Sequence, residues 1–382
     1  MSIGKIVFNS FQSLRLWAVL LAVLGSAAAQ ASPSEASPEG ESKFNAGDYI
    51  VHHISDAHSV HLWGKASEGI PEVSIPLPII LWTDNGLVFF MSSEFHHDAE
   101  GTVVVEANGQ RFVNYHEKIL YAAQAPDEHG SYAPIDHETH AVIGAVPFDL
   151  SITKSVFGMF VIMILMVFLF RSVGNAYKRR AGQAPRGFQN LLEPLILFIR
   201  DEVAIPSLGK KKADKFLPFL LTVFFFIWMC NILGLVPFLG GFNITGTLGV
   251  TLVLAAFVFV LTSINGNKHY WGHILWPPGI PLPIKFILVP IELVGVVLKP
   301  IVLMIRLTAN ISAGHIVILA FVSLVLMFGE VSTGLGYGVG VGAVAFMVFM
   351  FFLELLVAFL QAYVFTLLAA LYFGDATHEA HH

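Results

Sequence analysis

Charge is scarce in this sequence of 382 residues. Charged residues make up 13% of it, against about 25% in soluble domains, and apolar residues make up 55%. A chain of this composition buries most of its surface against lipid. The composition therefore favours a membrane protein and argues against a soluble enzyme.

Cysteines and nucleotide-binding motifs are also rare or missing. The single cysteine, Cys230, lies within an apolar run, so an intrachain disulfide is excluded. The phosphate-binding pattern GxxxxGK[ST] does not occur, which excludes a P-loop nucleotide site in this chain. We expect no cofactor and no nucleic-acid partner.

The histidine-rich parts of the chain lack a metal-binding pattern. Ten of the 16 histidines lie in the first 150 residues, but none belongs to a Cys/His finger or a helical HExxH. We expect solvated surface histidines and no metal, and the same holds for the C-terminal HEAHH at 378–382. The main histidines concerned are His52, His53, His58, His61, His96, His97 and His116.

The N-terminus has the pattern of a secretory signal peptide. Two basic residues precede an apolar run at 16–24, and the small residues GSAAAQAS follow. We expect a signal peptide over residues 1–31. An uncleaved signal anchor is the alternative, although the run is short for a span of about 20 residues. Residues 32–45 are rich in Pro, Ser and Glu, which predicts a disordered linker.

Residues 46–150 have the pattern of short strands. Apolar and polar residues alternate in VSIPLPIILWT, GLVFFMSS and TVVVEANGQRFVNYHEKILYA. Asn108-Gly109 stands where a two-residue hairpin turn is expected. We therefore expect a small β-rich domain outside the membrane, followed by a membrane domain over 151–382.

Three apolar runs that could cross a membrane follow, at 155–170, 216–240 and 245–263. Basic residues crowd the connection between the first two runs, which predicts a cytoplasmic connection by the positive-inside rule. The first span then runs from outside to inside, in agreement with an exported β-rich domain. Within the connection, FQNLLEPLILFIRDEV suits an interfacial amphipathic helix.

Two longer apolar runs complete the chain. The first extends from Ile291 to Phe328 with Pro300 as its only strong break, and the second covers 338–373. Each is too long for one upright span of about 20 residues. Hydropathy alone therefore leaves the number of crossings open.

Arg306 lies in the most apolar part of the chain. No acidic residue occurs within ten positions of it on either side. A guanidinium stays protonated at physiological pH and costs about 2.5–3.5 kcal/mol at the centre of a membrane helix. A group outside this segment must therefore compensate its charge, unless the side chain reaches a headgroup or a static ion pair.

The segment KPIVLMIRLTANISAGH, residues 299–315, resembles the signature of subunit a of the F-type ATP synthase. The similarity continues in FLELLVAFLQAYVFTLLAALYF, where Glu354 and Gln361 fall seven residues apart. It covers most of 280–375 and reaches back more weakly to about residue 150. It says little about the first 150 residues.

The resemblance implies a fold and a function. It implies an all-α polytopic membrane protein with about five crossings, in which two long tilted helices form a hairpin against the c-ring. The implied function is that of a stator subunit that conducts protons through two offset half-channels. Its implied partners are the c-ring, a b-type peripheral stalk, the F1 subunits, the lipid bilayer and protons. Its implied location is the bacterial inner membrane, with the N-terminal domain periplasmic and the C-terminus cytoplasmic.

The resemblance also assigns roles to individual residues. Arg306 would be the essential charge that faces the c-ring carboxylate. The outer half-channel would be lined by His315, Glu354, Asn310 and Gln361, and the inner one by Glu292. His315 and Glu354 occupy positions where this family commonly carries a His and a carboxylate, in either order.

Several of these residues also have plainer interpretations. The amides Asn310 and Gln361 could serve interhelical hydrogen bonding, and Glu354 could be a static partner of another subunit. Lys299 suits a snorkelling anchor as well as a functional role. Gly234, in CNILGLVPF, stands where many relatives have Asp, so an acid there is not available.

Two other classes of function fit an intramembrane arginine or an exported domain. One is a secondary transporter with Arg306 as the site for an anionic substrate, although the chain shows no internal repeat. The other is a membrane-anchored assembly protein in which the β-rich domain is the working part. Neither the coupling ion nor the ring stoichiometry follows from this sequence.

Overall fold

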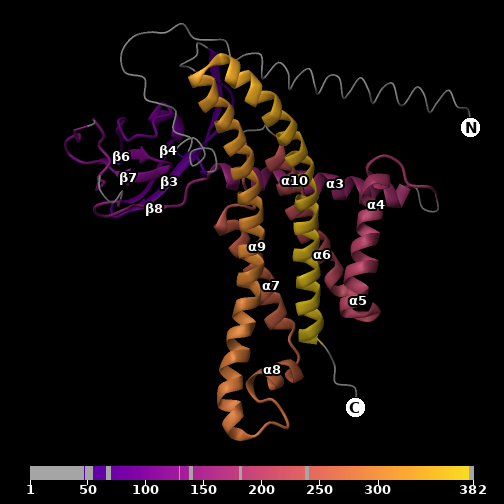
Figure 1. Ribbon diagram of the computed structural model, residues 1–382. Helices are drawn as coiled ribbons and strands as arrows, with labels where there is room; N and C mark the ends of the chain where they lie inside the picture. The colour runs from indigo at the N-terminus through magenta and orange to yellow at the C-terminus, as the bar shows by residue number, and fades with distance from the viewer. Residues whose placement is uncertain are drawn as a thin grey trace, which may run out of the picture. The chain divides into compact units, whose positions relative to one another are not determined.

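The N-terminal third of the described chain consists of short antiparallel strands, and the rest is helical (Figure 1). The structure is a computed structural model that describes residues 47, 55–65, 70–128, 130–136, 141–179, 183–236 and 241–377. These residues belong to one unit, Asn45–His382. The expected signal peptide and linker, and the HEAHH segment, lie outside the described residues.

Eight strands form three small sheets in the described region. β1 (Ser59–Lys65) pairs with β2 (Ile70–Pro76); β3 (Pro78–Thr83) lies between β4 (Gly86–Met91) and β8 (Phe148–Asp149); and β6 (Gln110–Tyr115) lies between β5 (Val105–Ala107) and β7 (Lys118–Tyr121). A 3-10 turn, η2, covers Ser92–Phe95. The expectation of a β-rich region is confirmed.

The predicted hairpin turn lies between β5 and β6. Ala107 pairs with Gln110, so Asn108 and Gly109 are the two turn residues. Their φ angles are 52° and 72°, the left-handed values that a tight hairpin turn of this type requires. Asn and Gly tolerate this conformation best, which explains why the sequence signal was reliable here.

The core of the β-rich region is aromatic and aliphatic. The rings of Phe90 and Phe112 lie 5.8 Å apart, and the rings of Phe112 and Tyr121 lie 5.5 Å apart. Ile79 and Leu81 of β3 are fully buried in the same cluster. One face of the β3 sheet is thereby covered.

The alternation predicted for the first two strand segments is wrong for β3 and β4. The side chains that point away from the core on these strands are also apolar, including Trp82 and Phe89, which are exposed. The strands were placed correctly, but their outer face does not carry the polar residues of a solvated sheet.

The helical part has five helices, within the described residues, that are long and apolar enough to cross a membrane. They are α3 (Lys154–Arg179), α6 (Lys210–Leu235), α7 (Leu248–Asn265), α9 (Leu282–Val331) and α10 (Thr333–Thr377). A shorter helix, α8 (Lys268–Leu275), precedes α9. Each of the five expected apolar runs corresponds to one of these helices, although α6 ends at Leu235, inside the run 216–240, and α7 begins at Leu248, inside the run 245–263.

The two long helices are longer than the apolar runs suggested. At about 1.5 Å per residue, the 50 residues of α9 extend for about 75 Å. The helix continues through Pro290 and Pro300, so the expected break at Pro300 does not occur. Neighbouring groups in a membrane bundle compensate the hydrogen bond that a proline removes. α9 and α10 lie side by side, joined at Ser332 (Figure 1).

The segment between α3 and α6 is helical but is packed into the bundle. It comprises α4 (Phe188–Phe198), a π-helical turn η3 (Ile199–Ala204) and α5 (Ile205–Leu208). Ile199 and Val203 are fully buried, and η3 and α5 contact α6 and α10. The expectation of an interfacial helix is therefore incomplete, because the second half of the segment lies in the core.

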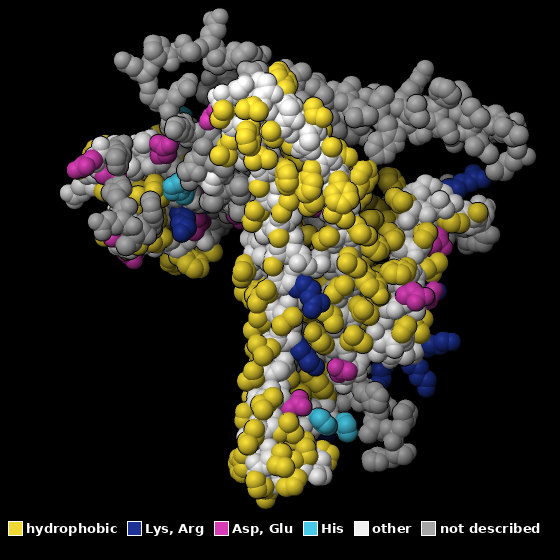
Figure 2. All heavy atoms as spheres, viewed as in Figure 1, with side chains coloured by type: hydrophobic (Ala, Val, Ile, Leu, Met, Phe, Trp, Pro, Cys, Tyr) yellow, Lys and Arg dark blue, Asp and Glu magenta, His cyan; other side chains and the backbone are white. Residues whose placement is uncertain are grey.

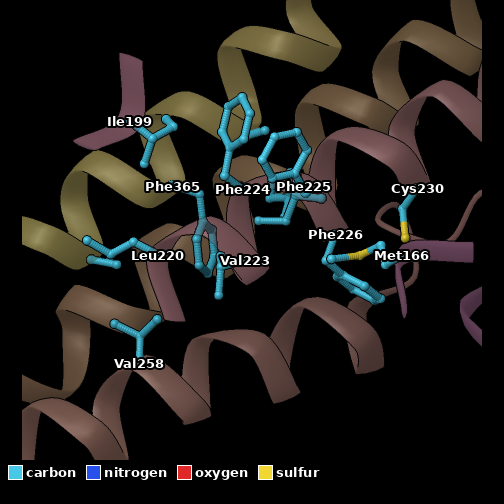
Figure 3. Packing of buried hydrophobic residues seen from close by; sticks show 14 of the residues in the cluster. Met166, Ile199, Leu220, Val223, Phe224, Phe225, Phe226, Cys230, Val258 and Phe365 are labelled. Atoms are coloured by element: carbon cyan, nitrogen blue, oxygen red, sulfur yellow. The ribbon is translucent and has the colours of Figure 1, made fainter. Parts of the chain in front are cut away.

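Phenylalanines dominate the core of the helical part (Figure 3). Phe224 and Phe225 of α6 are buried together, with ring centroids 5.2 Å apart. Met166 of α3 and Phe365 of α10 belong to the same cluster. Elsewhere the helices present hydrophobic side chains outward, as Figure 2 shows for α9 and α10. An outward apolar surface of this extent suits contact with lipid or other subunits.

Candidate functional site

Arg306 lies on a stripe of α9 that no other described part of the chain covers. The exposed positions recur every three or four residues, as one face of a helix does. Its members are Val302, Ile305, Arg306, Ala309, Asn310, Ala313 and Ile316. Arg306 and Asn310 thus share a face, as their spacing predicts. We call this surface the Arg306 stripe.

The guanidinium of Arg306 has no hydrogen bond or ion pair within the described residues. Tyr372 of α10 lies within electrostatic range of this guanidinium. A charged group left unpaired in an apolar surface is costly, so a partner outside this chain must compensate it. The expectation of external compensation therefore remains a prediction that this geometry favours.

Glu354 and Gln361 of α10 have the opposite orientation. Both are buried, with 9% and 7% of their surface exposed. Neither oxygen of the Glu354 carboxylate has a hydrogen-bond partner among the described residues. A buried carboxyl group without a partner is destabilising as a static feature, which favours a role that involves water or protons.

Glu354 lies against Gly314 of α9, the residue before His315. A Cβ atom on Gly314 would come within 2.5 Å of Glu354 Oε1, so the carboxylate occupies the space that a larger residue would fill. His315 follows Gly314 directly and is half-buried. The structure therefore brings Glu354 to the part of α9 that carries His315.

His315 also faces α6. A Cβ atom on Gly234 would lie 3.4 Å from His315 Nε2 and 2.5 Å from the carbonyl oxygen of Phe242. An Asp at position 234 would therefore collide with the backbone at Phe242.

Sequence reasoning missed a hydrogen-bonded group on the same side of the bundle. Asn231 of α6 donates from Nδ2 to the carbonyl oxygen of Ala358, one turn beyond Glu354, at 3.0 Å. Its Oδ1 accepts a hydrogen bond from the hydroxyl of Thr245 at 2.5 Å. An amide side chain within an apolar span indicates a hydrogen bond between helices, and Asn231 in CNILGLVPF is such a residue.

A second polar cluster lies on the other side of Arg306 along α9. Lys299 Nζ is 3.7 Å from Asp375 Oδ2 and lies 5.2 Å from the centre of the Tyr372 ring. A narrow cavity between α7, α8, α9 and α10 is lined in part by Lys299, Tyr270 and Tyr372. Sequence reasoning missed Asp375, because an acidic residue near the end of a helix does not by itself indicate a functional site.

Glu292 belongs to this second cluster. It is half-buried and lies within electrostatic range of Tyr270, as does Asp375. Burial, followed by these two negative charges, raises the pKa of the Tyr270 hydroxyl. The cluster is therefore acidic on balance near Tyr270.

The two clusters are offset along α9 with Arg306 between them. In a helix, His315 lies about 13 Å from Arg306 in one direction. Lys299 and Glu292 lie about 10 Å and 21 Å from it in the other direction. No hydrogen bond joins Asn310 to Gln361 in the described part of the chain, so these two amides are not brought together as a pair.

One predicted surface histidine is buried. His58 has 4% of its surface exposed, and its Nε2 donates a hydrogen bond to Oδ2 of Asp149 at 3.1 Å. Its backbone N–H donates to Oε2 of Glu117 at 3.2 Å. Burial alone would lower the pKa of His58, but the two carboxylates outweigh it and raise that pKa to about 9. The solvated interpretation of His58 is therefore wrong.

Other histidines agree with the expectation. His61, His96, His97 and His116 are exposed. His52 and His53 lie outside the described residues. Periodicity could not separate His58 from the rest, because its carboxylate partners lie 59 and 91 residues away in the sequence.

Two residues that precede His58 accept hydrogen bonds from the first turn of α3. The backbone N–H of Lys154 donates to the carbonyl oxygen of Ala57 at 2.8 Å, and that of Ser155 donates to Oδ1 of Asp56 at 2.8 Å. These bonds satisfy N–H groups that the first turn of a helix leaves without partners. The buried Lys154 side chain lies within electrostatic range of His315.

Comparison with known proteins identifies relatives of the helical part. The pattern of the ATP synthase A chain family matches residues 156–374. "ATP synthase subunit a" of Chlorobium phaeobacteroides is 44% identical over 243 residues, which are 61% of this chain and 68% of that protein. The protein of the same description from Chloroherpeton thalassium is 41% identical over 239 residues, 61% of this chain and 69% of that one.

A more distant relative matches a longer stretch. "ATP synthase subunit a" of Myxococcus xanthus is 38% identical over 286 residues, which are 71% of this chain and 86% of that protein. The β-rich region matches a separate family described as a domain of unknown function (DUF8433), over residues 49–150.

Proposed function

Because the chain belongs to the ATP synthase A chain family, we propose that it is the stator subunit that carries protons to and from a rotating ring of c subunits. The observation that carries this proposal is the Arg306 stripe, which presents one cation among apolar and small residues to a partner outside the chain. Alanines on such a stripe let a partner helix approach closely. ATP chemistry would belong to the F1 subunits, so this chain would translocate protons without being an enzyme itself.

The proposed mechanism follows from the charge of Arg306. A ring carboxylate must be neutral to cross lipid and ionised where it exchanges its proton with water. A fixed guanidinium opposite the carboxylate favours the ionised form and so promotes proton release. The same positive charge repels protons and prevents them from crossing directly between the two water-accessible sides.

His315 and Glu354 would line the outer half-channel, together with Gln361 and, at its edge, Asn310. Two observations support this assignment: the Glu354 carboxylate is buried without a hydrogen-bond partner in the described part of the chain, and it packs against Gly314, the residue before His315. A carboxyl group and an imidazole that are close together can pass a proton by exchanging it through water.

Glu292 would line the inner half-channel. Its support is the cluster with Lys299, Asp375 and Tyr270, on the opposite side of Arg306 from His315. The cavity bordered by Lys299 and Tyr270 adjoins this cluster and would hold the water that the inner half-channel needs. We add Asp375 to the residues of this half-channel.

The proposed arrangement in the membrane has five crossings, with α9 and α10 as a steeply tilted hairpin against the c-ring. The length of α9 supports this arrangement, because about 75 Å of helix cannot stand upright in a hydrocarbon core of about 30 Å.

The energy of proton transfer also bears on the proposed function. Each proton that moves through about 100 mV releases about 2.3 kcal/mol, so several protons are needed for each ATP.

We place the chain in a bacterial inner membrane with the β-rich region in the periplasm and the C-terminus in the cytoplasm. Basic residues between the apolar runs 155–170 and 216–240 support this orientation. They are Arg171, Lys178, Arg179, Arg180, Arg186, Lys210, Lys211, Lys212 and Lys215. The c-ring, a b-type peripheral stalk and the F1 subunits would be its protein partners.

Affinity purification from membranes in a mild detergent tests the proposal. We expect the tagged chain to bring down a small ring-forming subunit and soluble ATPase subunits, and the complex to pump protons in vesicles when ATP is added. Isolation of a lone oligomer that an anionic solute stabilises would instead support the transporter alternative. That alternative also predicts discontinuous helices, whereas α9 and α10 are continuous.

A further inference from the structure

The β3–β4 strand pair is apolar on both faces. One face is buried in the core of the β-rich region. The other face consists of alternate residues that point away from that core: Pro78, Ile80, Trp82, Leu87, Phe89 and Met91. An antiparallel sheet with one solvated face carries polar residues there. This face therefore has the composition of a covered surface.

Strand β8 extends the same face. Phe148 pairs with Trp82, which itself pairs with Leu87 across β3 and β4. The side chains of Trp82, Leu87, Phe89 and Phe148 are between 59% and 67% exposed. Nothing in the described chain covers them. We call these four residues and their apolar neighbours on β3 and β4 the outer sheet face.

The outer sheet face is tied to the start of α3. The chain leaves β8 at Asp149 and enters α3 at Lys154. On the way, Leu150 N donates to Ile80 O at 2.8 Å and Ile152 N donates to Pro78 O at 3.2 Å. The connection therefore stays bonded to β3 until two residues before the helix.

This connection limits the distance between the face and the membrane. Lys154 is six residues after Phe148, and even a fully extended chain would span only about 20 Å over that length. The exposed apolar side chains of α3 begin at Phe160, the seventh residue of the helix, so the hydrocarbon begins within about 10 Å of its N-terminus along the axis. The sheet must therefore lie at or near the headgroup layer.

We propose that the outer sheet face rests on the lipid bilayer at the membrane surface from which α3 starts. Trp82 and Phe89 would enter the boundary between headgroups and acyl chains, where amphipathic aromatic rings are favoured. The face has no charged side chain that would have to be dehydrated. This role is separate from proton transfer, since it depends only on the insertion of α3.

The single buried cysteine makes a direct test possible. In a Cys230→Ala background, Leu87→Cys and Phe89→Cys would each be labelled with a nitroxide in the assembled complex. The complex would be placed in vesicles of phosphatidylethanolamine and phosphatidylglycerol. Collision of the label with oxygen, which concentrates in lipid, would be compared with its collision with a water-soluble nickel chelate.

Two reference positions calibrate the measurement. Phe168→Cys lies at an exposed position of α3 and represents lipid, and Lys118→Cys lies at an exposed strand position and represents water. We expect labels at 87 and 89 to resemble the label at 168, with oxygen accessibility exceeding nickel accessibility. Values like those at 118 would show that the face is in water and would overturn the proposal.

A third pattern, in which both reagents are excluded, would also overturn it, because another protein would then cover the face. A second readout avoids cysteine substitution altogether. Brominated phospholipids should quench tryptophan emission of the complex, and Trp82→Phe should reduce the quenched fraction. An unchanged quenched fraction in Trp82→Phe would contradict the proposal independently.

Discussion

The carboxylate of Glu354 occupies the space beside Gly314 that any side chain would fill. A Cβ atom there would lie 2.5 Å from Glu354 Oε1, a distance that real Cβ contacts do not show. The contact joins α10 to α9 at the residue before His315. It also makes the position of the carboxylate sensitive to the smallest substitution.

Gly314→Ala should therefore displace Glu354 and slow proton transfer. A misplacement of about 1 Å at a reacting group can reduce a rate by on the order of 100-fold, so we expect a loss of at least several-fold in ATP-driven pumping. Gly295→Ala on the same helix is the matched control, because nothing lies within 4 Å of its Cβ position. Equal pumping by the two variants, per assembled complex, would contradict the assignment of Glu354.

Arg306→Ala should abolish ATP-driven proton pumping while the complex still assembles. The side chain is exposed and makes no hydrogen bond or ion pair within the described residues, so its loss should not disturb packing in this chain. Ile305→Ala, which removes an exposed apolar neighbour on the same stripe, is the control. Coupled pumping retained by Arg306→Ala would contradict the assignment of Arg306 as the charge that faces the ring carboxylate. Arg306→Lys should substitute poorly, because an ammonium deprotonates more readily and lacks the planar fork.

His315 and Glu354 should behave as an interacting pair. Removing either should slow proton entry, and the exchange His315→Glu with Glu354→His should recover more activity than independent effects predict. Residues in contact commonly show interaction energies of about 0.5–3 kcal/mol in double-mutant cycles. Pumping rates of the two single variants and the double variant measure this energy. A value of zero within error would count against a shared half-channel.

His58→Gln should loosen the junction between the β-rich region and α3, with the effect depending on pH. Removing one partner of a buried charged hydrogen bond costs about 1–3 kcal/mol. The pKa of His58 is raised from 6.5 to about 9 in the folded protein, so its stabilisation is fully present below pH 6.5 and is lost as the pH rises through about 9.

Asp149 makes the stability of the same junction depend on pH at the acidic end of the range. Burial alone would raise its pKa, but the hydrogen bonds from His58 and Ser151 outweigh burial and hold it below the ordinary value of 3.8. Its stabilisation is therefore present above pH 3.8 and is lost as the pH falls through the lowered pKa. Limited proteolysis of the assembled complex across this range should cleave His58→Gln faster than His61→Gln, an exposed control. The difference should shrink toward pH 9; a constant difference at all pH values would contradict this account.

Deletion of the segment from 46 to 150 should leave proton transfer intact in complexes that assemble. None of its titratable groups lies within an apolar span, so it can contribute contacts at the outer mouth but no group inside the bilayer. The segment before 46 would be joined to α3 at Lys154 through a short linker, and pumping would be measured per assembled complex.

A single substitution, Asp56→Ala, separates an effect of the deletion on assembly from an effect on proton transfer. Asp56→Ala removes the acceptor for Ser155 N and a negative charge within electrostatic range of Lys154, and should leave the sheets in place. If the deletion reduces assembly through the lost first turn of α3, Asp56→Ala should reproduce part of that reduction. Loss of pumping in fully assembled deletion complexes would show instead that the β-rich region shapes the proton entrance.

Local signals explain what could be predicted from the sequence. Apolar runs located all five long helices, because burial in lipid is a property of composition over about 20 residues. Asn108-Gly109 located a hairpin, because only a few residue types tolerate positive φ angles. Arg306 stood out because an isolated charge in an apolar run is costly wherever the helix packs.

Tertiary structure alone decided which polar groups meet and which remain uncovered. Arg306 and Glu354 both lie in apolar helices, yet one is exposed and the other buried, because burial depends on how α9 and α10 face each other. The burial of His58 by carboxylates far away in the sequence, and the apolar outer face beside Trp82, likewise depend on strand pairing. The chemistry of a side chain determines whether it prefers lipid or water. Only the packing of segments that are distant in the sequence determines whether that side chain is covered by protein or left exposed.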